Sequence, residues 1–408
     1  MKKTIIAFVF LLSFASCNRY LDIKPYGQTI PETAEEFSAL LHAQLDEIDY
    51  GEETVIGDGS TVADLECYAD NLAANLTQYP GGGYIPLYIG ENLSAKQTMY
   101  MNLYEVIRNC NIIIGNLEER DSRLGMDVLG TAYILRGICY YDLLRNFCQA
   151  CNPDNPGPGV PLVTEFDMEA KPTRSTYART VERIEEDLNK AIEYDIQDKI
   201  YRFNSDVAKG YLARLYFWTQ QYELAAQYAS ELLEKYPLLD PEPYKKMMGE
   251  QLTKSGNMIF KAQIYAGTSE STALTSLKGY LKNRPCSRQF YDLFAEKDRD
   301  VRFAISMDSK RLAVKNLLSC LRSAELQLIL AESYYHCDEP EKALAALNEL
   351  RRRRITDVTP YTVQTLPAVN PADLIQTDAK GNALTPLLYA ILCERRKELF
   401  FEGDRWYE

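Results

Sequence analysis

Aromatic and amide side chains gather in one glycine-rich stretch of the sequence. Between residues 64 and 92 these side chains are Tyr68, Asp70, Asn71, Asn75, Gln78, Tyr79, Tyr84 and Tyr88. Aromatic faces can cover the apolar C–H patches of a sugar ring, and amide or carboxylate groups can bridge neighbouring hydroxyls. The residue types in this stretch therefore have the chemistry of a sugar-binding surface.

The same residues also have ordinary structural interpretations. The chain holds 29 tyrosines, most of which we expect in the core or between helices. Asp70 and Asn71 could equally cap a helix or close an Asx turn. Neither tryptophan strengthens the site, because Trp218 lies in a helical pattern and Trp406 in a charged terminal motif. With tyrosines as the platforms, we expect modest affinity.

The usual catalytic constellations are missing from the sequence. It has two histidines, and we find no HExxH, no G-x-S-x-G, no phosphate-cradling glycine loop and no Cys/His cluster. A pair of carboxylates remains open among 58 acidic residues. The formal charge of −13 disfavours a nucleic-acid partner, which needs a basic face. We expect no enzyme activity, no metal and no cofactor.

The N-terminus carries an export pattern. Two lysines precede the apolar run 4–14, which is shorter than the ~20 residues of a membrane-spanning helix. The run predicts a signal peptide over residues 1–16. Two small residues then lead to Cys17 in a pattern that resembles a bacterial lipobox, with Phe14 where leucine is usual. We expect cleavage before Cys17 and its acylation, palmitate included; the alternative is an ordinary signal peptide cut nearby.

The ten cysteines favour few or no structural disulfides. Acylation of Cys17 leaves nine, an odd number that cannot pair completely. Several lie inside helical patterns, where a free cysteine packs as a small apolar residue: Cys110, Cys139, Cys320 and Cys393. Cys148 and Cys151 form a CxxC in a Pro/Asn/Gly-rich loop, where a local disulfide and, less readily, a redox or metal role stay open.

Helical periodicity dominates the chain. Thr33 is a candidate cap for a helix that runs through Leu45, and the stretch 55–93 is rich in glycine and proline, which predicts loops and short turns. The segment 258–265 alternates and is rich in strand formers. Further helical patterns run through residues 99–114, 128–144 and 180–194.

An internal repeat appears when the sequence is shifted by 118 residues. The shift places Leu212 on Leu330, Ala213 on Ala331, Tyr216 on Tyr334, Glu223 on Glu341, Ala225 on Ala343, Glu231 on Glu349 and Leu232 on Leu350. Each copy predicts a helix, a short polar turn and a second helix, as in a tetratricopeptide-like hairpin. A chance likeness of two amphipathic hairpins is the alternative. Residues 97–147 predict another hairpin of this kind.

Motifs along essentially the whole mature chain resemble those of the SusD/RagB-type outer-membrane nutrient-binding lipoproteins. They are Cys17 with Tyr20–Gly27, Leu135–Leu144 leading to Gly159–Leu162, Ala208–Tyr216, Leu321–Glu325 leading to Leu347–Arg351, and Glu394–Tyr407. The last, ERRKELFFEGDRWY, is the most specific. Its residues Arg395, Glu398, Glu402 and Arg405 we interpret as structural ion pairs.

The resemblance implies a mostly helical fold in which about four tetratricopeptide-like hairpins pack against an irregular, loop-rich region with a few short strands. It predicts a single domain over residues 17–408. The hairpins would lie at about 97–147, 177–235 and 320–354. The ligand loops would lie at about 55–93 and 256–290, which adds Tyr280 to the ligand-binding candidates Tyr68, Asp70, Asn71, Tyr84 and Tyr88.

The resemblance also implies a function. Such proteins are not enzymes; they sit lipid-anchored on the outer face of the outer membrane, bind oligosaccharides or polysaccharides, and deliver them to a SusC-like TonB-dependent transporter. Alternatives are a peptide-binding member, a surface glycoside hydrolase and a tetratricopeptide adaptor. Two departures stand out: the sequence stops at Glu408 inside a motif that relatives continue, which suggests truncation, and Asn18-Arg19 follow Cys17 where acidic residues often accompany surface export.

Overall fold

Helices make up most of the fold, as the sequence predicts. The computed structural model describes residues 31–50, 59–73, 94–165, 167, 169–196, 203–250, 254–262, 281 and 283–408. Within these ranges the strands form two antiparallel pairs: β1 (Pro158–Pro161) with β2 (Arg174–Thr176), and β3 (Met258–Lys261) with β4 (Cys320–Arg322). No helix in the described part of the chain is long and apolar enough to cross a bilayer.

The helix α2 (Ala34–Tyr50) begins at the cap that the sequence predicts. The Thr33 hydroxyl accepts a hydrogen bond from the Glu36 amide at 3.3 Å, and the Glu36 carboxylate accepts one from the Thr33 amide at 3.1 Å. This reciprocal pair satisfies amides that the first helical turn leaves without partners. Phe37 and Leu41 are buried and belong to the largest core cluster.

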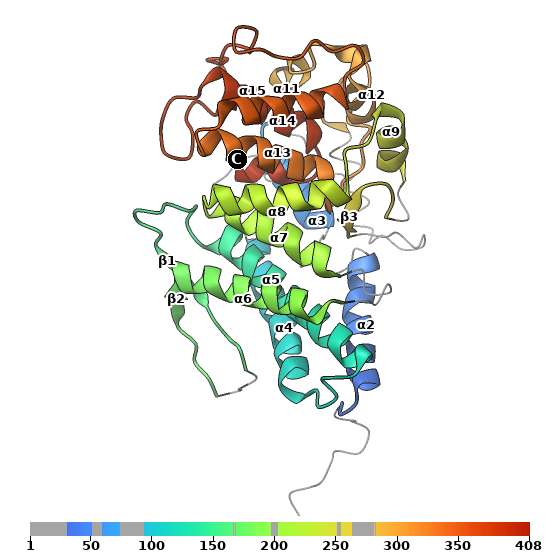
Figure 1. Cartoon of the computed structure of the whole chain (residues 1–408), viewed down its shortest axis with the longest axis vertical. Coiled ribbons are helices and arrows are strands. Elements are labelled where there is room, and N and C mark those ends of the chain that lie inside the picture. Colours follow the sequence, from blue (N-terminus) through green and yellow to red (C-terminus); the bar gives the residue numbers. More distant parts are fainter. Residues whose placement is uncertain are drawn as a thin grey trace, which may run out of the picture.

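Antiparallel hairpins form the body of the molecule and stack along its long axis (Figure 1). The first pairs α4 (Ser94–Asn116) with α5 (Arg123–Phe147), and α6 (Tyr177–Tyr194) packs along α5. The next two are α7 (Ser205–Trp218) with α8 (Tyr222–Lys235), and α13 (Ser323–His336) with α14 (Pro340–Arg352). The helix α15 (Pro386–Glu398) packs on α13 and α14.

The repeat predicted by the 118-residue shift is confirmed in backbone detail. The turns after α7 and α13 each place one residue in the left-handed region, Gln220 with φ 61° and Asp338 with φ 58°. The next amide in each copy, that of Gln221 or Glu339, bonds back to the carbonyl of Tyr216 or Tyr334 at 2.8 or 2.9 Å. Both copies are therefore a helix, a Schellman-type turn and a second helix, with the turn at the same place in each.

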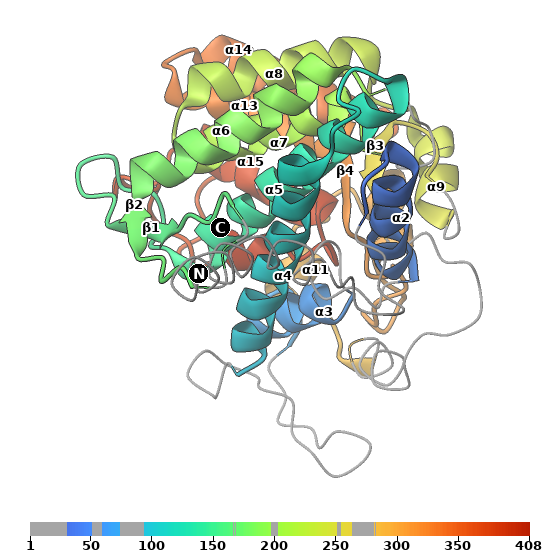
Figure 2. The same cartoon turned by 90° about the horizontal axis from the view of Figure 1, so that it is seen from below.

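The remaining elements connect the hairpins or lie beside them. They are α3 (Gly59–Tyr68), α9 (Pro241–Gly249), α11 (Arg288–Asp292), η1 (Lys297–Arg299), α12 (Val301–Ser306) and η2 (Asp404–Tyr407). Seen from below, α3 lies near α11 and the first turns of α4 (Figure 2). The strand β4 passes close to α7, because a Cβ added to Gly210 would lie 2.1 Å from the Leu321 side chain.

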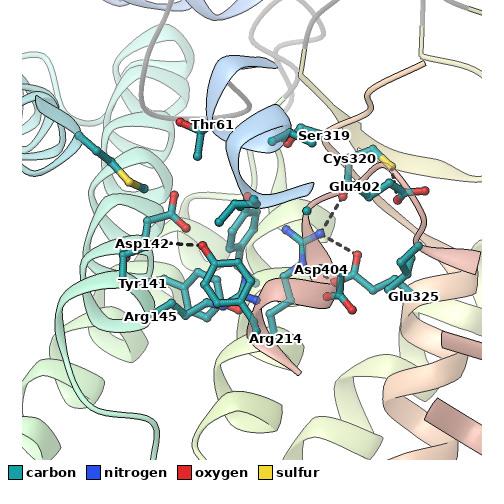
Figure 3. A pocket seen from close by; sticks show the side chains of 18 residues that line it. Thr61, Tyr141, Asp142, Arg145, Arg214, Ser319, Cys320, Glu325, Glu402 and Asp404 are labelled. Atoms are coloured by element: carbon teal, nitrogen blue, oxygen red, sulfur yellow. Dashed lines mark hydrogen bonds and ion pairs between the residues drawn. The ribbon is translucent and has the colours of Figure 1, made fainter. Parts of the chain in front are cut away.

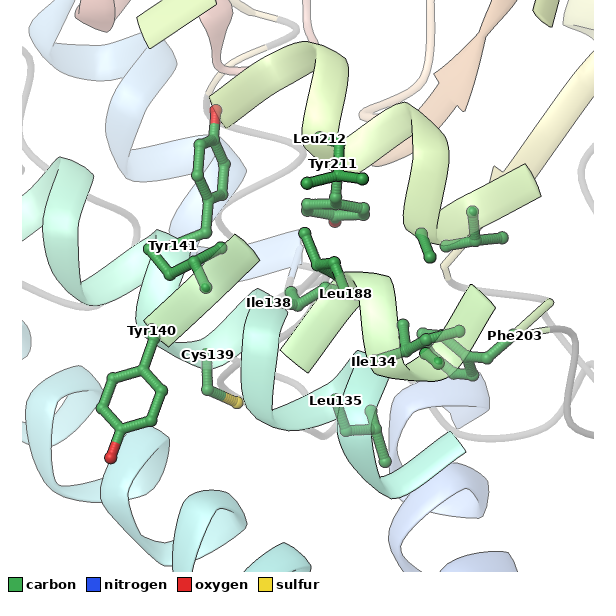
Figure 4. Packing of buried hydrophobic residues seen from close by; sticks show 14 of the residues in the cluster. Ile134, Leu135, Ile138, Cys139, Tyr140, Tyr141, Leu188, Phe203, Tyr211 and Leu212 are labelled. Atoms are coloured by element: carbon green, nitrogen blue, oxygen red, sulfur yellow. The ribbon is translucent and has the colours of Figure 1, made fainter. Parts of the chain in front are cut away.

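The main core lies between α5, α6 and α7. Ile134 and Ile138 of α5, Leu188 of α6 and Leu212 of α7 are fully buried and meet there with Phe203 (Figure 4). Helix α5 is buried on nearly all sides because α4, α6 and α7 each cover part of it. This explains its near-continuous apolar sequence, which is typical of a central helix.

One prediction needs correction. The stretch 55–93 was expected to form loops and short turns, yet residues 59–68 form the helix α3. Val62, Ala63 and Cys67 lie on one buried face of that helix, so burial outweighs the glycines that flank it. The strand predicted at 258–265 is confirmed over Met258–Lys261 as β3, with β4 as its partner, and residues 263–265 lie outside the described residues.

Candidate functional site

The described part of the predicted ligand region begins with α3 and the turn that follows it. Tyr68, at the end of α3, packs against Trp406 with ring centroids 5.3 Å apart. Its side chain is only partly buried. Burial raises the pKa of Tyr68 to about 12, and its hydroxyl, which is protonated at neutral pH in any case, can donate a hydrogen bond.

Asp70 is held by two arginines of the terminal motif. Arg405 binds its carboxylate through two nitrogens, at 2.7 and 3.1 Å, and Arg396 approaches the same carboxylate at 3.1 Å. Burial alone would raise the pKa of Asp70, but the hydrogen bond from Arg405 and the charge of Arg396 outweigh it and hold the pKa below its ordinary value. Asp70 is therefore an ionised, intramolecular partner.

Asn71 is buried and also pairs within the chain. Its side-chain oxygen accepts a hydrogen bond from Arg396 Nε at 2.8 Å, and its amide nitrogen donates to Glu66 Oε2 at 3.4 Å. The other oxygen of Glu66 accepts from the Gly403 amide at 3.0 Å. Burial raises the pKa of Glu66 to about 7. Both the oxygen and the nitrogen of the Asn71 side chain are therefore hydrogen-bonded within the protein.

Two segments far apart in the sequence meet at this place. Leu72 and Cys286 form an antiparallel bridge, and the Ala73 amide donates to the carbonyl of Pro285 at 2.8 Å. The Ser287 hydroxyl donates to the backbone carbonyl of Asp70, and the Ser287 amide donates to the backbone carbonyl of Asn71. We call residues 70–73 and 284–287 the double root. The segments with Tyr84, Tyr88 and Tyr280, which adjoin it in sequence, lie outside the described residues.

The terminal motif forms a buried network of charges, as its sequence predicts. Glu398 accepts from Arg322 at 2.6 Å and from Arg354 at 3.0 Å, and Glu402 binds Arg322 at 2.8 Å and Lys315 at 2.7 Å. Arg395 pairs with Asp404 at 2.8 Å, in addition to the pair of Arg405 with Asp70. The charged residues of the terminal motif indicated ion pairs here, but the sequence could not name all their partners.

A small cavity lies between α3, the hairpins and the terminal motif (Figure 3). Its volume is about 120 Å³, and Tyr141, Arg145 and Arg214 line one side of it. Arg214 donates to both oxygens of Glu325, at 2.7 and 2.6 Å, and to the carbonyl of Cys320 at 2.7 Å. Both oxygens of Glu325 are therefore bound by Arg214, whereas the acid of a hydrolase must be able to reach its substrate.

A larger cavity of about 500 Å³ adjoins the first and shares Tyr141, Arg145 and Arg214 with it. Its wall has an aromatic part, which includes Trp218 and Tyr222, and a loop over residues 374–379. Several buried polar atoms on this wall have no hydrogen-bond partner among the residues that the structure describes: Arg145 Nε, Trp218 Nε1, Gln220 Oε1, Glu332 Oε2 and Arg395 Nη1. Such atoms need water, further polypeptide or a ligand to satisfy them.

Comparison with known families gives two matches that together span the chain from residue 19 onward. A family profile described as starch-binding and associating with the outer membrane matches residues 19–217, and the SusD family profile matches residues 214–408. The chain belongs to the SusD family. The resemblance of the sequence motifs is thereby confirmed, and so is the mostly helical, hairpin-based fold.

Solved structures of SusD-type proteins have the same fold. A SusD superfamily protein from Bacteroides thetaiotaomicron is 21% identical with a TM-score of 0.69, over 92% of this chain and 88% of that one. A SusD-like carbohydrate binding protein from Bacteroides vulgatus is 21% identical with a TM-score of 0.67, over 92% and 82%. A putative sugar binding protein from Bacteroides vulgatus is 24% identical with a TM-score of 0.67, over 93% and 87%. The comparison with curated proteins gave no match.

The SusD-family chain offers no cluster of metal-ligating side chains in its described part. The cysteines there, Cys148 and Cys151 among them, are all free thiols. Cys151 donates to the carbonyl of Thr219 at 3.5 Å, and Cys148 lies 3.8 Å from a nitrogen of Arg174. Burial raises the pKa of both thiols, so neither is an activated thiolate.

Proposed function

We propose that this SusD-family protein binds an oligosaccharide or polysaccharide and delivers it to a SusC-like TonB-dependent transporter of the outer membrane. Family membership supports the binding of carbohydrate. The observation that carries the site is the double root: residues 70–73 and 284–287 are hydrogen-bonded, so both tyrosine-bearing segments adjoin one place. Tyr68, Tyr84, Tyr88 and Tyr280 supply the sugar-stacking faces.

The roles of the polar candidates follow from their partners. The side chains of Asp70 and Asn71 form hydrogen bonds with Arg396, Arg405 and Glu66. In this proposal they shape the site, while the tyrosines make the direct contact with the sugar. Stacking on tyrosine alone gives modest affinity, and modest affinity suits a protein that must release its ligand to a transporter.

The anchor and the location form the second part of the proposal. Cys17 carries the lipid, palmitate included, which holds the protein at the outer membrane with its ligand site towards the cell surface. The membrane contact is therefore made by the lipid and not by a spanning helix. The acidic charge of −13 agrees with a protein that does not bind nucleic acid.

The competing functions predict features that differ from those observed. A tetratricopeptide adaptor would expose a continuous apolar face on its repeats, yet among the described large aliphatic residues of α7, α8, α13 and α14 only Leu224 is exposed. A hydrolase needs two functional carboxylates beside its sugar site. Beside the double root, Asp70 is locked in ion pairs, and Glu66 is fully buried with both oxygens bonded, to Asn71 and to Gly403.

Isothermal titration against a panel of plant and host polysaccharides tests the proposal. We expect at least one glycan to bind, and expect Tyr84→Ala and Tyr88→Ala to weaken that binding at least tenfold. Tyr228→Ala on α8, whose ring packs on Tyr216 at 5.8 Å, is the matched control and should bind as the wild type does. Binding that survives in both loop variants contradicts the site. Peptide binding without glycan binding, or sugar products after long incubation, contradicts the function.

A further inference from the structure

The wall of the larger cavity carries two opposite charges that lack a charged partner. Arg145 of α5 forms no ion pair with an acidic residue in the described part of the chain, and its buried Nε has no hydrogen-bond partner there. Glu332 of α13 forms no ion pair with an arginine or lysine of the described ranges, and its Oε2 has no partner among them either. Charges taken out of water are normally paired, so each of these groups lacks a counter-charge.

Arg145 lies among aromatic rings instead of carboxylates. Its Cζ is 3.6 Å from the ring centroid of Tyr407 and 5.2 Å from that of Trp218. Trp218 Nε1 is a second buried donor of this wall without a partner in the described residues, and it belongs to the ring beside Arg145. An arginine N–H next to an indole N–H suits a carboxylate, whose oxygens can accept from both.

The acceptors lie around the end of α13. Tyr222 stacks on His336 at 4.3 Å, one turn after Glu332, so the turn that carries Gln220 lies near this part of α13. Gln220 Oε1, like Glu332 Oε2, is a buried acceptor without a described partner. His336 Nε2 is 4.0 Å from the Glu332 carboxylate, and burial lowers the pKa of His336, so its neutral ring does not balance the charge. Burial raises the pKa of Glu332 to about 7, more than the charge of Arg395 lowers it.

The other charged side chains of this wall have partners. Their ion pairs, with shortest distances of 2.6, 2.8 and 2.6 Å, are Arg214 with Glu325, Arg395 with Asp404, and Glu408 with Arg405. Asp378 accepts hydrogen bonds from two backbone amides of its own loop, at residues 380 and 382. One positive and one negative group therefore remain to be balanced, which calls for an occupant with both charges.

We propose that the larger cavity is a second binding site, which takes a small zwitterion of the amino-acid type. The ligand carboxylate binds Arg145 and Trp218, the ligand ammonium binds Glu332 and Gln220, and the ligand side chain packs on the aromatic part of the wall. A volume of about 500 Å³ is in the range of small-molecule sites. This inference does not depend on the proposed glycan site, because no residue of the double root lines the cavity.

Calorimetric titration of the full-length protein with the twenty protein amino acids tests the site. For the amino acid that binds most tightly, the N-acetyl derivative lacks the ammonium and the amide lacks the carboxylate, so each should bind at least tenfold more weakly. Glu332→Gln keeps the size of the side chain and should weaken binding at least tenfold. The control Glu341→Gln, at the exposed start of α14, should bind as the wild type does. No binding of any amino acid at millimolar concentration, or equal binding of both derivatives, overturns the inference.

Tryptophan fluorescence shows where the ligand binds. The chain has two tryptophans, so Trp406→Phe leaves Trp218 of the cavity wall as the only one. Emission of this variant should change as the amino acid binds, with the dissociation constant found by calorimetry. Unchanged emission places the ligand elsewhere and overturns the inference, and so does a loss of glycan affinity in Glu332→Gln, which would place sugar in the cavity. A wild type that binds amino acids but no glycan contradicts the proposed function and supports this inference.

Discussion

Replacing Glu398 by glutamine should destabilise the protein more than any exposed charge replacement. The Glu398 carboxylate is completely buried and receives Arg322 at 2.6 Å, Arg354 at 3.0 Å and Arg302 at 3.5 Å. Its backbone carbonyl also accepts from Arg322, at 2.9 Å. Burial alone would raise the pKa of Glu398, but the charges of Arg354, Arg322 and Arg302 hold the pKa well below its ordinary value.

The expected loss follows from the partners that remain. Glutamine keeps the size of the side chain, but it removes the charge and turns an amide donor towards arginines that can only donate. Breaking a buried ion pair from one side costs about 3–5 kcal/mol. The matched control is Glu349→Gln on α14, because Glu349 binds Arg352 and Arg353 at the surface, where a pair contributes about 0–1 kcal/mol.

Urea denaturation followed by circular dichroism measures both variants. The wild-type advantage over Glu398→Gln should be full above pH 4.5, the ordinary pKa of the group in the unfolded chain. It should shrink as the pH falls below 4.5, because the unfolded chain then binds a proton at Glu398 while the folded carboxylate stays ionised. If Glu398→Gln lowers the free energy of unfolding by less than about 1 kcal/mol at pH 7, as Glu349→Gln does, the buried ion pairs stabilise the protein no more than a surface pair.

Three further outcomes are expected. Burial raises the pKa of Glu66 to about 7, so between pH 4.5 and 7 the group ionises in the unfolded chain but not in the folded protein. The free energy of unfolding should therefore fall by roughly 3 kcal/mol over this range, and Glu66→Gln should flatten that slope in thermal unfolding curves. Gly210→Ala should cost about 1–3 kcal/mol, since its Cβ would lie 2.1 Å from Leu321, whereas Gly115→Ala, with nothing within 4 Å, should be neutral or slightly stabilising in the same melts. Labelled palmitate should enter the wild type but not Cys17→Ala, and equal labelling would contradict the anchor.

Local patterns were enough to predict several of the longer helices and the repeat. The 118-residue shift works because both copies use the same turn, with Gln220 and Asp338 in the left-handed region. Thr33 was found as a cap because its partner Glu36 is three residues away. Features of this kind depend on neighbours in the sequence, and a single sequence contains them.

The candidate site was predicted only in part, for physical reasons. Tyr68, Asp70 and Asn71 were chosen by side-chain type, but the contacts of Asp70 and Asn71 with Arg396 and Arg405 join residues more than 300 positions apart. Periodicity has no information on such pairs. Similarly, the flanking glycines indicated a loop at residues 59–68, whereas burial of Val62 and Cys67 against distant segments makes it a helix. Tyr84, Tyr88 and Tyr280 remain predictions.

A crystal structure with the tightest-binding oligosaccharide tests the central claim most directly. The account predicts sugar density stacked on tyrosines of the segments that adjoin residues 70–73 and 284–287, with Asp70 still bound to Arg405. Sugar in the larger cavity, against Trp218 and Glu332, would contradict the assigned site. Failure of every glycan to bind at millimolar concentration would contradict the function itself.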